Sequence, residues 1–169
     1  MSISMYSASV PIFTAMLGNL AKWLDRAESY ATEKKFDPVV LLGTRLAPDM
    51  LPFTRQVQIA CDGAKFCVAR LAGVEAPRFE DNESTFAELK ARIAKTLEFV
   101  ASVAAAQIDG TEDRDITIPR RDSSTVMKGE AYLKHFALPN LFFHVTTAYA
   151  LLRHNGVPLG KGDYLGLTS

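Results

Sequence analysis

An apolar repeat near the middle of the chain limits its possible folds more than any other feature. Between Pro48 and Gly73, apolar side chains stand alternately three and four residues apart, at Met50, Phe53, Val57, Ala60, Ala64, Cys67 and Leu71. An α-helix brings positions with this spacing onto one face, whereas a strand does not. The segment is therefore predicted to be a helix that starts around Pro48-Asp49, ends at Gly73 and buries one seam against other helices.

Three further segments carry seams of the same kind. The first is predicted to start at an N-cap, Ser9, and to end at Asp37-Pro38. Another opens with a capping box from Thr85 to Glu88. The last is predicted to begin at 138–140 and to end at Asn155-Gly156. Four seams without a convincing sheet predict an all-α fold, a four-helix bundle that forms a single domain over residues 1–169.

The segments between the predicted helices are less regular. Residues 38–48 form a connection with room for a short helical turn. Between Asp113 and Lys128, β-branched residues stand among charges, which predicts a small two-stranded excursion between the third and fourth helices. A short helical turn is predicted over 129–136, broken by Leu138-Pro139-Asn140. The tail from 159 to 169 shows no periodicity.

Charge and cysteine content narrow the class of protein. Lys and Arg number 19 and Asp and Glu number 19, so no basic excess favours nucleic acid or an anionic membrane surface, and neither partner is expected. No stretch is uniformly apolar over the length of a membrane span. The two cysteines, Cys61 and Cys67, lack a disulfide framework, which together with the absence of a signal peptide predicts a cytoplasmic protein. Both thiols are interpreted as inert core residues.

Candidate site residues come from constellations, because the common nucleotide, metal and hydrolase motifs are absent. His144 lies beside the seam of the last helix, where it could be a metal ligand, a base or a hydrogen-bonded histidine at the core edge. In the second long helix, Gln58 and Asp62 share a face. Asp62 could pair with His144, the minimal unit for base catalysis or metal ligation, or form a salt bridge with Lys65 or Arg55.

Longer sequence runs resemble a known family. They are Arg45-Leu46-Ala47-Pro48-Asp49-Met50, Gln56-Val57-Gln58-Ile59-Ala60-Cys61-Asp62, Leu138-Pro139-Asn140, Phe143-His144-Val145-Thr146-Thr147-Ala148-Tyr149 and Leu152-Arg153-His154-Asn155-Gly156-Val157-Pro158-Leu159-Gly160. The chain resembles an uncharacterised bacterial domain-of-unknown-function family in the DinB/YfiT-like superfamily. The resemblance implies a four-helix bundle, commonly a homodimer. Many members hold a divalent metal through one histidine on the second helix and a pair spaced H-x-x-x-H on the last. Characterised relatives are thiol-dependent transferases and an isomerase.

Only part of that metal site can be transferred to this sequence. His144 matches one histidine of the last-helix pair, but Ala148 stands where its partner would be, and the second helix has no histidine. Gln58 or Asp62 would have to substitute. We therefore expect either no cofactor or a weakly held divalent metal on His144 and Asp62.

Three functional hypotheses follow. The first is a homodimer with a pocket between the second and last helices that binds a small molecule, or a metal weakly, and is lined by Gln58, Asp62, His144 and Tyr149. The second is a thiol-dependent transferase or isomerase that uses His144 with Asp62. The third is a non-catalytic dimeric interaction protein. Whether the chain is an enzyme stays open.

Overall fold

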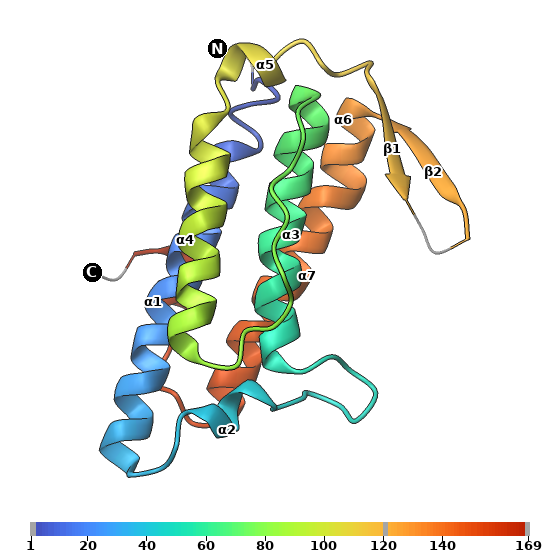
Figure 1. Ribbon diagram of the computed structural model, residues 1–169. Helices are drawn as coiled ribbons and strands as arrows, with labels where there is room; N and C mark the ends of the chain where they lie inside the picture. The colour runs from blue at the N-terminus through green and yellow to red at the C-terminus, as the bar shows by residue number, and fades with distance from the viewer. Residues whose placement is uncertain (1–2, 120–121, 168–169) are drawn as a thin grey trace.

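Four long helices carry the fold of this chain, whose computed structural model describes residues 3–119 and 122–167 (Figure 1). They are α1 (Val10–Lys34), α3 (Phe53–Ala72), α4 (Phe86–Ser102) and α7 (Leu138–His154). The connections hold shorter elements: α2 (Val39–Leu42), α5 (Ala105–Ile108), β1 (Asp115–Pro119), β2 (Ser124–Lys128), α6 (Gly129–Tyr132), the π-helical turn η1 (Leu133–Ala137) and α8 (Lys161–Leu165). The predicted helical bundle with a small β excursion is confirmed.

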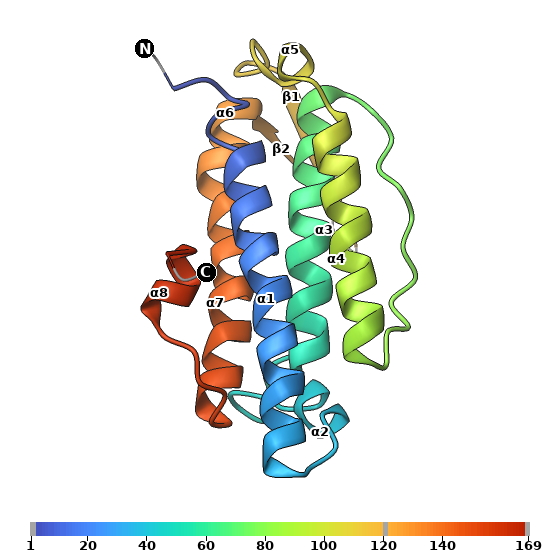
Figure 2. The same ribbon diagram turned by 90° about the vertical axis from the view of Figure 1, so that its left-hand side faces the viewer.

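The four long helices form a ring in which each packs on two neighbours. α3 lies against α7 and α4, and α1 lies against α4 and α7 (Figure 2). Figure 1 shows that α1 and α7 run in one direction and that α3 and α4 run in the other. Their seams bury the core, including every apolar position predicted for α3 from Phe53 onward. The helix begins at Phe53 and not at Pro48-Asp49, because Pro52 has an extended backbone. Met50 therefore lies before the helix and not within it.

The parallel direction of α3 and α4 requires a long connection. α3 has 20 residues and is therefore about 30 Å long. The chain must return over that length before α4 begins, and the extended segment 73–85 is long enough to do so. We call this segment the crossover strap. It runs along the outside of the bundle beside α3 and α4 (Figures 1 and 2), and it ends in the predicted capping box, with Glu88 N–H donating to Thr85 Oγ1 at 3.2 Å.

The β excursion forms a hairpin at the end of the bundle. β1 and β2 pair antiparallel with Asp115 opposite Lys128 and Ile118 opposite Thr125. β1 alternates exposed and buried residues, and Ile116 and Ile118 face the core. The hairpin packs on α6, and its Ile118 lines a cavity together with residues of α3.

The route from the hairpin into α7 differs from the prediction. Leu138-Pro139-Asn140 does not interrupt the helical structure, because α6, η1 and α7 follow one another without a gap. A proline inside an α-helix removes one N–H and crowds the carbonyl four residues earlier. The wider π-turn directly before Pro139 accommodates it, and such turns frequently occur at functional sites.

Two smaller findings concern the chain ends. Ser9 stands at the N-cap of α1, but its side chain donates to the Met5 carbonyl instead of capping the helix. In the tail, expected to be irregular, α8 packs on α1, where Tyr164 stacks on Trp23 with ring centroids 5.7 Å apart. Over the described residues, no helix combines the length and apolarity needed to cross a membrane.

Candidate functional site

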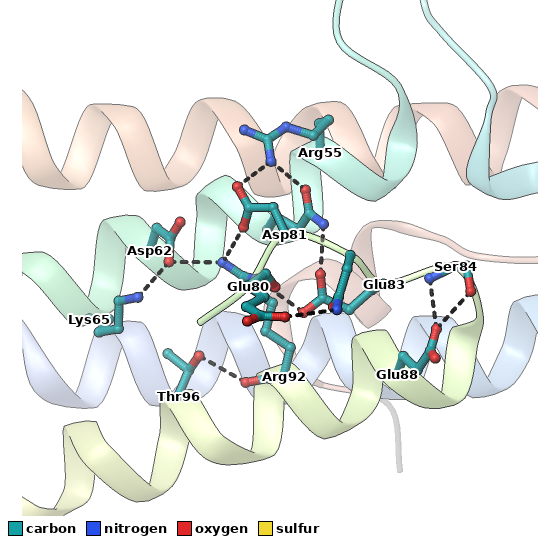
Figure 3. Close-up of polar contacts among 12 residues, drawn as sticks. Arg55, Asp62, Lys65, Glu80, Asp81, Glu83, Ser84, Glu88, Arg92 and Thr96 are labelled. Carbon is teal, nitrogen blue, oxygen red and sulfur yellow. Dashed lines mark hydrogen bonds and ion pairs between the residues drawn. The ribbon is translucent and has the colours of Figure 1, made fainter. Parts of the chain in front are cut away.

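A buried arginine joins the crossover strap to two helices. Arg92 lies in α4 with 3% of its surface exposed. Its Nη2 donates to Asp62 of α3 at 3.0 Å and lies 3.0 Å from Asp81 of the strap. Its Nη1 donates to the Glu83 carboxylate at 3.0 Å and to the Glu80 carbonyl at 3.1 Å (Figure 3). A buried charge must be paired, so this side chain holds the strap against the bundle.

Polar side chains of α3 complete this attachment. Arg55 donates to Asp81 at 2.5 Å and to the Gln58 amide oxygen at 2.7 Å. Gln58 in turn donates to Glu83 at 2.7 Å. Gln58, predicted to line a pocket toward the last helix, is therefore engaged with the strap.

The carboxylate of Asp62 is fixed on one side and open on the other. Its Oδ1 lies 2.8 Å from Lys65 Nζ and accepts from Arg92. Figure 3 shows its second oxygen pointing away from both cations. Within the described chain Oδ2 accepts no hydrogen bond, and the side chain is 26% exposed. Asp62 thus makes one of the salt bridges foreseen as an alternative, with Lys65, and keeps a free acceptor.

His144 has a different partner from the one proposed. Its Nδ1 lies 2.7 Å from Gln56 Oε1. Because Gln56 Nε2 already donates to the Leu51 carbonyl, Oε1 is the acceptor here, which assigns the proton to Nδ1. Burial lowers the pKa of His144, so the ring is neutral near pH 7. Within the part of the chain that the structure describes, its Nε2 has no hydrogen-bond partner. Asp62 and His144 make their contacts with separate partners.

Tyr149, the last of the predicted pocket residues, lies in an aromatic cluster. Its ring makes edge contacts with Trp23 at 5.5 Å and with Tyr164 at 5.7 Å. The four predicted residues are therefore distributed over three surroundings: the strap, the Gln56 pair and the contact of α8 with α1.

Two cavities flank the outer face of α3. The strap cavity, of about 520 Å³, lies between α3 and the crossover strap. The hairpin cavity, of about 210 Å³, lies between α3, β1 and the α6–η1–α7 stretch. Asp62, Phe66 and Arg70 line both. These residues are four apart, so they form one stripe along α3, and we call the whole depression the α3 cleft.

Arg70 is a cation that lines both cavities of this cleft. Its Nη1 donates to the Tyr132 hydroxyl at 3.0 Å, and its guanidinium lies 5.1 Å from the centre of the Phe66 ring. Within the residues that the structure describes, no carboxylate pairs with it. Burial raises the pKa of Tyr132 to about 12, so the phenol keeps its proton. The hydroxyl accepts from Arg70 and can donate its own proton to a ligand.

The cysteines are buried elsewhere in α3. Burial raises the pKa of Cys61 to about 12 and raises that of Cys67 as well. Because the thiolate is the reactive form, both are poor nucleophiles, in agreement with their interpretation as core residues.

Comparison with known proteins decides the family. The model of a family described as a domain of unknown function, DUF1993, matches residues 5–165. The chain belongs to the DUF1993 family. The crystal structure of a DinB family member protein from Shewanella denitrificans is similar, with a TM-score of 0.90 and 46% sequence identity over 95% of this chain and 91% of that one. The predicted membership in an uncharacterised DinB-like family is confirmed. No curated protein matches.

The residues of this DUF1993 chain do not fit the three-ligand metal site that the resemblance implies. At the junction of α3 and α7, Gln56 stands opposite His144 and uses its oxygen to accept from the ring, while Ala148 offers no donor atom. Among the described residues, no three His, Cys, Asp or Glu side chains are grouped so that they could hold a metal ion.

Sequence reasoning missed several residues of the site, among them Arg70, Tyr132, Arg92 and Gln56. Arg92 does leave a signal, because it stands three residues after Leu89 within the buried stripe of its helix, where a charge is unexpected. Arg70 leaves none, since an arginine on the last turn of a helix is common at the surface.

Proposed function

We propose that this DUF1993 protein binds a small organic molecule in the α3 cleft. The observation that carries the proposal is that two cavities share Arg70, a cation without an acidic partner, and Asp62, a carboxylate with one free oxygen. Ligand sites are concave, largely apolar and supplied with a few polar groups. The strap cavity alone is within the usual volume range for such sites.

The other surfaces support this function less well. A cavity of about 380 Å³ on the α4 side of the strap is lined mainly by charged and polar side chains, so an apolar ligand would gain little there. The cleft, by contrast, has aromatic walls from three elements: Phe66 of α3, Phe79 of the strap and Phe136 of η1.

Thiol-dependent transfer has less support. That reaction was assigned to Asp62 acting with His144 as a base. Asp62 is engaged by Arg92 and Lys65, and His144 is engaged by Gln56. The two groups therefore do not form the pair that the hypothesis needs, and binding alone is the function proposed.

Anilinonaphthalenesulfonate, an aromatic anion, is a suitable first probe. We expect it to bind with enhanced fluorescence and to shift the amide NMR signals of α3 around Phe66 and of the hairpin. Arg70→Gln should weaken binding about tenfold, the loss expected for a hydrogen-bonded charge of about 1.5 kcal/mol. Lys22→Gln removes the same charge from an exposed position of α1 and is the matched control.

Two results would refute the proposal. One is equal affinity of the Arg70→Gln and Lys22→Gln variants for the probe. The other is a set of NMR shifts confined to surfaces away from α3, such as the exposed Phe143 of α7. Circular dichroism of each variant shows whether the helical content is retained.

A further inference from the structure

The hairpin cavity has polar groups at two places and apolar walls between them. Asp62 and Arg70 stand eight residues apart on α3, which places their backbones about 12 Å apart along the helix. Phe66 lies between them on the same stripe. A ligand that reaches both polar groups must therefore be elongated and have an apolar middle.

The walls favour a flat ring. The Tyr132 and Phe136 rings are stacked, with centroids 5.7 Å apart and an angle of 21° between their planes. Phe66 supplies a third ring from the opposite helix, and Ile118 of β1 closes the side. Aromatic groups pack on such surfaces through stacked or edge contacts, which add to the burial of apolar area.

The volume of the hairpin cavity suits a ligand with one ring. The cavity of about 210 Å³ corresponds to about seven water molecules at the volume of liquid water. Phe66, which is 37% exposed, also lines the strap cavity. Gly63 and Asn140 also line the cavity, and they approach closely, since a Cβ on Gly63 would lie 3.2 Å from the Asn140 amide nitrogen.

The polar groups at the two places have opposite character. At one, Arg70 has N–H groups left over after its bond to Tyr132, and the Tyr132 hydroxyl can donate as well. A carboxylate matches such donors, since a guanidinium pairs with its two oxygens in a planar fork. At the other, Asp62 offers only its free Oδ2, which accepts. A hydroxyl or amino group of the ligand matches that acceptor.

We infer that the ligand of the α3 cleft is a small aromatic carboxylic acid with a hydroxyl or amino group at the far end of its ring. The carboxylate lies on Arg70 and Tyr132, the ring lies beside Phe66, and the far group donates to Asp62. This inference rests on the proposed function and adds the chemical class of the ligand. Lys65 and Arg92 hold Asp62 in place as the acceptor.

A set of single-ring probes tests this assignment by calorimetry and amide NMR. The probes are para-hydroxybenzoate, para-aminobenzoate, benzoate and phenol. We expect the two para-substituted acids to bind at least about fivefold tighter than benzoate, and phenol to bind weakest. Tyr132→Phe should weaken the acids several-fold, because it removes a donor to the carboxylate and also the acceptor that holds the Arg70 guanidinium. It should leave phenol, which has no carboxylate, unchanged. Lys22→Gln serves again as the control.

The Asp62→Asn variant locates the donor. It should abolish the advantage of para-hydroxybenzoate over benzoate and leave benzoate itself unchanged. If the Asp62→Asn variant fails to fold, the affinities of para-hydroxybenzoate and benzoate for the wild-type chain and for Tyr132→Phe still test the inferred ligand class. Equal binding of the two acids to the wild-type chain overturns the inference.

The outcomes separate this inference from the proposal on which it rests. If anilinonaphthalenesulfonate binds in the cleft while benzoate binds as well as its para-substituted forms, the cleft is a ligand site and the ligand class is wrong. If neither the fluorescent anion nor any benzoate shifts the signals of α3, both fail together.

Discussion

Replacement of Arg92 by Met tests how the crossover strap is held. Methionine keeps a long flexible side chain and removes the charge. The substitution deletes four contacts of the guanidinium: those with the carboxylates of Asp62, Asp81 and Glu83 and with the carbonyl of Glu80. Loss of one partner of a buried ion pair typically costs about 3–5 kcal/mol, because charges stay behind without compensation.

The arrangement around Arg92 places the expected cost at the lower end of that range. Each carboxylate keeps a second donor, which is Lys65, Arg55 or Gln58. The Asp62 and Asp81 side chains are also 26% and 40% exposed, so water replaces part of the lost interaction. We therefore expect a loss of about 3 kcal/mol in the free energy of unfolding. In a domain of this size that loss corresponds to a fall of about 6–12 °C in the melting temperature.

Urea unfolding at neutral and acidic pH gives the measurement. Lys95→Met, an exposed position one turn further along α4, is the matched control and should change stability by less than about 0.5 kcal/mol. Although burial acts in the opposite direction, the bonds and charges of Arg55 and Arg92 lower the pKa of Asp81. A lowered carboxyl pKa adds stability above its unfolded value of 3.8, and that stability is lost as the pH falls through the folded value. The difference between wild type and Arg92→Met should therefore shrink in acid. A loss below about 1 kcal/mol at neutral pH would refute this account.

Other substitutions test other parts of the structure. Burial lowers the pKa of His144 below its usual 6.5, so the unfolded chain takes up the proton first and the free energy of unfolding should fall as the pH drops below about 6.5. Urea unfolding of His144→Gln should lack that part of the pH dependence. The same pH dependence in His144→Gln and in the wild type would contradict this expectation. Gly129→Ala should lower the free energy of unfolding by about 2–3 kcal/mol, because its Cβ would lie 2.1 Å from the Thr111 carbonyl oxygen. Gly18→Ala in α1, whose Cβ meets nothing within 4 Å, should raise it by about 0.5–1 kcal/mol. Similar melting temperatures for the two variants would be inconsistent with this packing. The DinB-like resemblance implies a homodimer, for which light scattering should give twice the chain mass of 18.5 kDa. Phe143→Glu, at an exposed position of α7, should shift the measured mass toward that of the monomer. A monomeric wild-type chain would rule the homodimer out.

The elements predicted correctly are those set by local, periodic signals. The α3 seam identified a helix because apolar positions three and four apart must share a face. Thr85 and Glu88 marked the start of α4 because their capping bonds span only three residues. Gly73 marked the end of α3, where its backbone adopts a left-handed φ of 70°. The helix α8 was missed because it depends on distant packing, in which Tyr164 stacks on Trp23.

The candidate site was predicted only in part, and for a related reason. The α3 seam points to the inside of the bundle, whereas the stripe of Asp62, Phe66 and Arg70 lies on its outer flank. An outer flank is ordinarily a solvated surface. Here it becomes concave because the crossover strap covers one side and the hairpin with η1 covers the other. The crossover strap carries no periodic pattern, and the alternation in β1 predicts a strand but not the part of the bundle that it covers.

The proposed ligand site lies apart from the place that the DinB-like resemblance implies for a metal. At the place implied for the metal, Gln56 and His144 satisfy each other through one hydrogen bond, which stabilises the contact of α3 with α7. Within the described residues, Asp62 keeps a free oxygen and Arg70 has no carboxylate partner, and both lie further along α3 between the crossover strap and the hairpin. Since loops tolerate substitution and insertion far better than packed seams, a site built from them can change its ligand without disturbing the bundle. Binding specificity within this family should therefore vary with the strap and the hairpin while the four long helices stay the same.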